Sequence, residues 1–329
     1  MKIKKIISLM LVLILCFALC ACKDEVHTSS ADVNSVSSKT ENNVSAKCNP
    51  LLYKVTDGKG NVVWLFGSIH VGREDYFPLP KYVTNAFNES DTLAVELDIV
   101  AFEKNIGDQM SAVSGLLYND GTTIKDYISE ELYNKSVKVL EEYNTYLTAL
   151  DLYCPSFWSS MIESFMIQDL GGDVDLGIDR HLINMANKSK KEIDEIESAD
   201  FQYGMLADFD NDIQVMLLES AVHSYENKEE AAADLKKMMD LWALGDQEKF
   251  AEYLNSSEGE MTDEEKQIYE KYSKAMFTDR NITMADYAEQ ALLGGKETFI
   301  CVGAAHVVGE GAVADILGQK GYTVECIAE

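Results

Sequence analysis

From residue 51 onward, the chain alternates short apolar runs of strand length with long stretches of helical periodicity. The runs 51–57 and 61–67 are separated by Gly58-Lys59-Gly60, a turn sequence that predicts a β-hairpin. Further strands are expected at residues 92–97, 192–196, 298–302 and 322–327. Helices are expected at roughly 123–150, 156–169, 178–188, 199–226, 229–255, 262–293 and 309–318. Parallel strands joined by helical crossovers predict an α/β fold. Its central sheet should be mainly parallel and flanked by helices, with large helical insertions between strands.

The first 22 residues have the pattern of a bacterial export signal. Lysines at the start precede the uncharged, largely apolar run 6–21, which is shorter than the roughly 20 residues of a membrane span. The run ends on Leu19-Cys20-Ala21-Cys22, which is similar to the lipobox of bacterial lipoproteins. We therefore expect a signal peptide over 1–21 and lipid attachment at Cys22, which would anchor the protein to the membrane outside the cytoplasm. The serine-rich segment 22–47 is expected to be a flexible, lipid-anchored tether to one folded domain over 48–329.

Charge and cysteine content narrow the possible partners. The formal net charge of −28 becomes −31 when the three lysines before Cys22 are removed with the signal, so we exclude a nucleic-acid partner. The four cysteines after residue 22 match no zinc framework. Cys301 and Cys326 fall in two strands predicted to be neighbours, so they can either form a disulfide or stay free thiols.

One short internal repeat carries two of the five histidines. In the segments 64–72 and 300–309, apolar strand residues lead into Gly-x-x-His-Val, which contains His70 and His306. Open α/β sheets bind ligands at the carboxyl edge of their parallel strands. If the two strands are neighbours, His70 and His306 face one another at that edge.

Other candidates lie at strand ends and helix starts. Glu96 closes an apolar run, where a buried carboxylate requires a cation, an Arg or several hydrogen-bond donors; the alternative is that the strand has reached solvent there. Arg280 follows Thr278-Asp279, a predicted helix cap, so it would sit in the first helical turn and be aimed at an anionic group. Asp179 could orient a histidine, although helix capping is the preferred interpretation. Glu197 is a second strand-end carboxylate with weaker support.

These motifs resemble those of the TraB/PrgY/GumN family, which is related to the Tiki metalloproteases and more distantly to erythromycin esterase-like and ChaN-like proteins. The resemblance runs from about Leu51 to Ile327. It rests on Leu65-Phe66-Gly67-Ser68-Ile69-His70-Val71-Gly72, Pro78-Leu79-Pro80, Ala94-Val95-Glu96-Leu97-Asp98, Gly177-Ile178-Asp179, Thr278-Asp279-Arg280-Asn281 and Val302-Gly303-Ala304-Ala305-His306. It implies that the family's paired histidines, strand-end Glu and Arg fall on His70, His306, Glu96 and Arg280. Tiki members look like metal-dependent peptidases, so the resemblance implies a hydrolase.

Three functions are compatible with these residues. In the first, His70, His306 and Glu96 bind a divalent metal (Zn, Mn, Fe or Co) in a peptidase-like hydrolase, with Arg280 stabilising the oxyanion. In the second, a metal-free hydrolase of esters or amides uses a histidine as general base with Arg280. In the third, a surface protein captures peptides without cleaving them. The sequence contains no His-Glu-x-x-His, Gly-x-Ser-x-Gly or P-loop motif, which argues against zincin, serine-hydrolase and P-loop chemistry.

Overall fold

The computed structural model describes residues 48–256 and 261–327. The predicted signal peptide, Cys22 and the tether lie outside these residues and stay predictions. Across the described ranges, every helix is too short or too polar to span a membrane.

A six-stranded sheet with the strand order β4-β3-β5-β2-β1-β6 forms the centre of the molecule. Its strands are β1 (Leu52–Thr56), β2 (Val62–Ser68), β3 (Thr92–Val95), β4 (Glu192–Glu195), β5 (Thr298–Gly303) and β6 (Thr323–Ile327). The predicted α/β class is confirmed, and so is the hairpin of β1 and β2. The pairs β2–β5, β3–β5 and β3–β4 are parallel, whereas β1 pairs antiparallel with both β2 and β6. The sheet is therefore mixed, and only the four strands β4-β3-β5-β2 are parallel.

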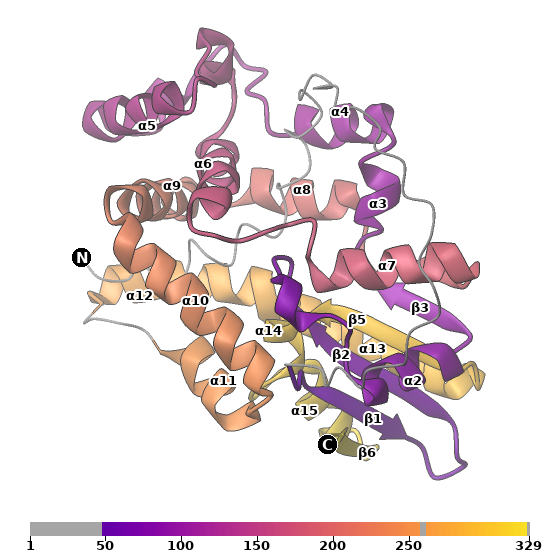
Figure 1. The fold of residues 1–329 in the computed structure, drawn as a ribbon. Coiled ribbons are helices and arrows are strands. Elements are labelled where there is room, and N and C mark those ends of the chain that lie inside the picture. The colour runs from indigo at the N-terminus through magenta and orange to yellow at the C-terminus, as the bar shows by residue number, and fades with distance from the viewer. Residues whose placement is uncertain (1–47, 257–260, 328–329) are drawn as a thin grey trace, which may run out of the picture.

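Helices pack along the sheet and also form a separate helical region beyond the carboxyl ends of the parallel strands (Figure 1). The helices that contact the sheet most are α7 (Ile178–Ser189), α13 (Asp279–Gly294), α14 (Ala304–Val307) and α15 (Val313–Gln319). The others are α2 (Lys81–Glu89), α3 (Ile99–Phe102), α4 (Ile106–Ser114), α5 (Glu130–Glu142), α6 (Pro155–Asp169), α8 (Ala199–Asp208), α9 (Asn211–Glu226), α10 (Lys228–Leu244), α11 (Gln247–Asn255) and α12 (Asp263–Ser273). The insertion between β4 and β5 supplies α8 to α13, as the long helical stretches predict.

Local capping residues divide several stretches that periodicity alone predicts as single helices. The stretch 229–255 breaks at Gly245, which is left-handed with φ of 67°, and restarts where the Asp246 side chain accepts a hydrogen bond from the Lys249 amide. The stretch 123–150 keeps only α5 as an α-helix, which begins where the Ser129 side chain caps the Leu132 amide. Gly245 thus ends α10, and the Asp246 and Ser129 side chains cap the starts of α11 and α5, so helix boundaries occur even where apolar spacing continues.

The expected proximity of Cys301 and Cys326 is wrong. Cys301 lies in β5 and Cys326 in β6, with β2 and β1 between them. Three strand spacings amount to about 14 Å, whereas disulfide-bonded Cα atoms lie less than about 7 Å apart. Cys301 is a buried free thiol and Cys326 an exposed one, so the thiol alternative is the one observed.

Gly67, the first residue of the His70 motif, allows α14 to pack directly on β2. A Cβ atom at this position would lie 2.9 Å from Ala304 Cα and 3.1 Å from Ala304 Cβ. Gly67→Ala is therefore expected to lower the free energy of unfolding by about 1–3 kcal/mol, because α14 must shift. Chemical denaturation measures the effect. Gly58→Ala is the control, since a Cβ there meets no atom of the described chain within 4 Å, and an equal loss in both variants would contradict the packing argument.

Candidate functional site

His70 and His306 meet at the carboxyl edge of the parallel strands, as the repeated motif predicts. The strands β2 and β5 are parallel neighbours, with Ser68 opposite Gly303. A Cβ atom placed on Gly303 would lie 3.8 Å from His70 Nε2, 3.7 Å from His306 Cδ2 and 3.3 Å from Glu96 Oε1. The three side chains therefore surround one backbone position, where a Cβ would make ordinary contacts with both imidazoles and a tight contact with Glu96.

Asp179 holds the ring of His70. Its Oδ2 atom lies 2.9 Å from His70 Nδ1, and because a carboxylate only accepts, Nδ1 carries the proton. Helix α7 approaches closely enough for this contact because Gly177 stands at its start, where a Cβ would lie 2.6 Å from the His70 carbonyl oxygen. The preferred interpretation of Asp179 as a helix cap is wrong, because Gly177 is the N-cap residue of α7 and no side chain caps the start of this helix. The His70 Nε2 atom is buried and has no hydrogen-bond partner among the described residues.

Asn281 holds His306 in the same way. The Asn281 amide nitrogen donates to the Gly311 carbonyl at 2.9 Å, which turns its Oδ1 atom toward His306 Nδ1 at 2.7 Å. His306 Nδ1 is therefore the donor, and the lone pair of the neutral ring is on Nε2. Both imidazoles are thus fixed through Nδ1 by a side-chain oxygen, an arrangement typical of histidines that act through Nε2.

Glu96 and Arg280 form the centre of a buried ionic cluster that also contains Glu197. The Arg280 Nη2 atom lies 2.5 Å from Glu96 Oε2 and 2.8 Å from Glu197 Oε2, and Nε lies 2.7 Å from Glu197 Oε1. The other oxygen of Glu96 accepts the Gly303 amide at 2.6 Å. Glu197, a weak candidate from sequence, is therefore a full partner of Arg280.

Arg280 lies in the first turn of α13, as predicted, but the predicted side-chain cap at Thr278-Asp279 is wrong. The π-helical segment η5 (Lys274–Thr278) joins α12 to α13, and Thr278 has helical dihedral angles without a side-chain cap. Such π-helical turns are frequent at functional sites. Here, the segment leaves the Met276 carbonyl to accept from Arg280 Nη1 at 3.3 Å.

The cluster shifts the ionisation of its members in opposite directions. Burial would raise the pKa of Glu96, but Arg280 and the two histidines outweigh it and lower that pKa to about 2. Burial, followed by the positive charge of Arg280, lowers the pKa of His306 to about 3. Burial also acts to lower the pKa of His70, but Asp179 and Glu96 outweigh it and raise it above the usual value. Two neighbouring imidazoles with opposite shifts can serve different acid–base roles.

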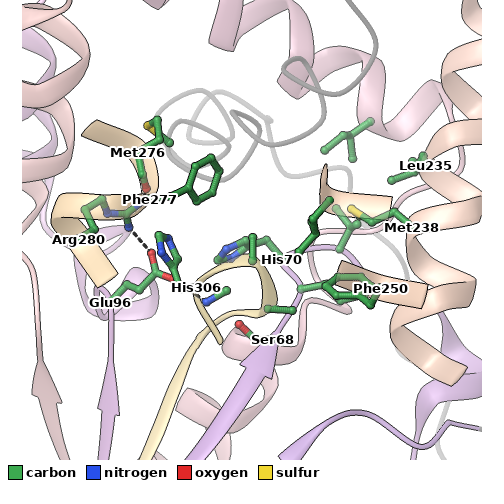
Figure 2. Close-up of a pocket in the computed structure, with 17 residues that line it drawn as sticks. Ser68, His70, Glu96, Leu235, Met238, Phe250, Met276, Phe277, Arg280 and His306 are labelled. Carbon is green, nitrogen blue, oxygen red and sulfur yellow. Dashed lines mark hydrogen bonds and ion pairs between the residues drawn. The ribbon is translucent and has the colours of Figure 1, made fainter. Parts of the chain in front are cut away.

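A single pocket brings all four predicted site residues together. His70, Glu96, Arg280 and His306 line it, with Ser68 beneath them. Figure 2 shows the two imidazoles between the Glu96–Arg280 pair on one side and Leu235, Met238 and Phe250 on the other. The Phe277 ring lies against His306 with centroids 5.6 Å apart, which shields that imidazole from solvent.

The donor groups fit a divalent transition metal in part. Two Nε2 atoms with their Nδ1 atoms held by oxygen are the ligands such an ion prefers. Glu96 lies beside them, but each of its oxygens already accepts a hydrogen bond, so it could bind an ion only by sharing those oxygens. Among the described residues, no group of three His, Cys, Asp or Glu side chains is arranged to hold a metal ion.

Several functional residues carry no strong signal in the sequence. Asn281 follows Arg280 directly in a matched motif, but an asparagine on a helix has many possible partners. The pocket wall on α10 and α11 has no motif, because an apolar residue that faces a pocket is of the same type as one that faces the core. For Asp179 the signal was present, because orienting a histidine was one of its two interpretations.

The fold and the site together define an α/β protein with a paired-histidine site at the carboxyl edge of its sheet. The chain belongs to the TraB/PrgY/gumN family, whose family model matches residues 51–326, so the resemblance of the motifs is confirmed. It is similar to the uncharacterized protein YbaP of Escherichia coli (strain K12) and of Shigella flexneri. The identity is 24% over 267 residues in each case, covering 77% of this chain and 86% of each relative. No solved structure matches the chain.

Proposed function

We propose that this chain is a metal-dependent hydrolase of peptide-like amides or small esters, with His70 and His306 as metal ligands. The observation that supports it is the meeting of two buried imidazoles at the carboxyl edge of the sheet, each held through Nδ1 by a side-chain oxygen. Glu96 is the third ligand of the proposal. Zn, Mn, Fe and Co all accept this combination of donors. A divalent ion bound there would supply Lewis acidity, which allows water to attack a carbonyl at neutral pH.

The residues of the chain orient and protect this site. Asp179 and Asn281 fix both rings, so that little reorganisation remains when substrate binds. Arg280 keeps Glu96 ionised, and Glu197 keeps Arg280 in place. The four hydrogen bonds of Arg280 leave one N–H group on Nη1. The proposed stabilisation of the oxyanion by Arg280 therefore depends on this remaining N–H group.

A second candidate, a metal-free hydrolase, is favoured by the contact between His70 and Asp179. A carboxylate that orients a histidine and stabilises its protonated form is the arrangement of a general base. In that case His70 Nε2 takes the proton of the attacking water directly. In either case, we propose that a lipid on Cys22 holds the protein at the membrane outside the cytoplasm.

The decisive experiment combines metal analysis with an assay of the purified full-length chain. We expect one metal ion per chain, cleavage of members of a peptide library, loss of activity in chelator and its return on metal add-back. Full activity in chelator would reject the metal and leave the histidine-base mechanism. Binding without cleavage under every metal tested would overturn both hydrolase proposals and favour a peptide-capturing protein.

A further inference from the structure

We infer that the pocket beside the paired histidines selects an uncharged apolar group of the substrate next to the bond that is cleaved. This inference deepens the proposed function and rests on it. On the side opposite Glu96 and Arg280, the pocket has an apolar wall that contains Leu235, Met238 and Phe250 (Figure 2), and Ile167 and Leu254 also line the pocket. These side chains come from α6, α10 and α11, which all lie outside the sheet. The substrate group that enters the site therefore contacts carbon and sulfur on this side.

A charged substrate group would have no partner on this wall. The charged side chains among the lining residues are Arg280 and Glu96, with the two histidines beside them. Arg280 is 3% exposed and already paired with two carboxylates, and both oxygens of Glu96 already accept hydrogen bonds. Against the apolar wall, a substrate charge would lose its hydration without gaining a counter-charge, which disfavours it strongly. An apolar group loses no hydrogen bonds and gains buried area.

The wall is held in a defined position over the histidines. The Trp242 Nε1 atom of α10 donates to the Gly67 carbonyl of β2 at 2.8 Å, and Arg73, just beyond the His70 motif, pairs with Asp240 of α10 at 2.6 Å. These contacts fix α10 relative to the strand that carries His70. Met238 is on the same helix and half-buried, and a methionine can adapt to apolar groups of different shape. The wall is therefore both positioned and adaptable, as a side-chain subsite requires.

Equilibrium binding to the full-length His70→Ala chain tests the inference without depending on turnover. The probes are N-acetyl-Ala-Leu-Ala amide, N-acetyl-Ala-Asp-Ala amide and N-hexanoyl-alanine amide, with Kd values from NMR titration. We expect the leucyl peptide, the hexanoyl amide or both to bind about 100-fold more tightly than the aspartyl peptide. Comparing the two apolar probes shows whether the apolar group that the pocket prefers is a peptide side chain or an acyl chain. Equal affinities for all three probes would overturn the inference, whether or not the wild-type chain hydrolyses anything.

A charge placed on the wall should change the preference. Met238→Lys is made in the His70→Ala chain. It is expected to reduce the ratio of the affinities for the leucyl and aspartyl peptides about tenfold or more, because the lysine can pair with the aspartate. Leu244→Lys is the matched control on the same helix, since Leu244 is 52% exposed and does not line the pocket. Leu254→Lys on α11 repeats the test if Met238→Lys does not fold. An unchanged preference in folded wall variants would contradict the subsite.

Discussion

His70→Ala is expected to abolish hydrolysis, with a loss of about 10²–10⁴-fold or more, and to release the metal as well. The Nε2 atom of His70 is buried, directed into the pocket and unpartnered among the described residues. With it removed, only His306 and a Glu96 already engaged by Arg280 remain, which are too few ligands for a transition metal. Metal content by mass spectrometry and hydrolysis of the peptide library measure the two losses separately.

Two further variants help to interpret the His70→Ala result. Asp179→Asn keeps His70 but removes the carboxylate from its Nδ1 atom, and is expected to weaken metal binding about 10–100-fold. His181→Ala is the control, because this half-buried histidine of α7 packs on Phe77 with ring centroids 4.4 Å apart and does not line the pocket. Loss of activity in His70→Ala with full retention of metal would contradict the ligand role and favour His70 as a base.

Arg280→Met is expected to lower the free energy of unfolding by about 3–5 kcal/mol, because it leaves two carboxylates in the protein interior without their cation. Glu197 is 8% exposed and accepts two hydrogen bonds from Arg280, and Glu96 accepts another. Urea denaturation at neutral pH measures the loss. Lys296→Met is the control, since its ion pair with Glu192 is largely exposed and should contribute less than about 1 kcal/mol.

The cause of that loss can be tested by removing the unpaired charge in two ways. Glu197→Gln added to Arg280→Met should recover part of the stability, whereas Glu197→Gln alone should destabilise the chain. Without Arg280, the effect of burial, which acts to raise the pKa of Glu96 in the folded state, is no longer offset by the positive charge of Arg280. Lowering the pH should therefore reduce the loss in free energy of unfolding that Arg280→Met shows relative to the wild type, because the unpaired carboxylate becomes protonated. Raising the pH should restore that loss. A deficit that is independent of pH and of Glu197 would show that lost packing, not charge, is the cause.

Much of the site was predictable because it follows from strand geometry. The repeated Gly-x-x-His motif predicts that His70 and His306 are adjacent if their strands are parallel neighbours, and β2 and β5 are. Glu96 at the end of a buried strand requires a partner, and Arg280 is that partner. The first prediction follows from the adjacency of parallel strands, and the second from the small number of partners that a buried charge at a strand end can have.

The remaining features depend on strand order and local competition, which one sequence does not reveal. In sequence, only the short helices α14 and α15 separate the strand of Cys301 from that of Cys326, yet the hairpin of β1 and β2 lies between these strands in the sheet. Thr278-Asp279 has the composition of a helix cap, but η5 continues the helix through it. Asp179 could serve its own helix or a distant histidine, and the closeness of Gly177 to the His70 carbonyl decides for the histidine. Each outcome depends on tertiary packing that local propensity does not contain.

The ionic cluster also influences how this protein must fold. Arg280 and Glu96 are 184 residues apart in the chain, and Glu96 and Gly303 are 207 apart. Contacts between such distant residues form only after a large loss of chain entropy, so they are slow to nucleate and belong to the last stages of folding. The residues of the pocket therefore come together only in the complete native topology.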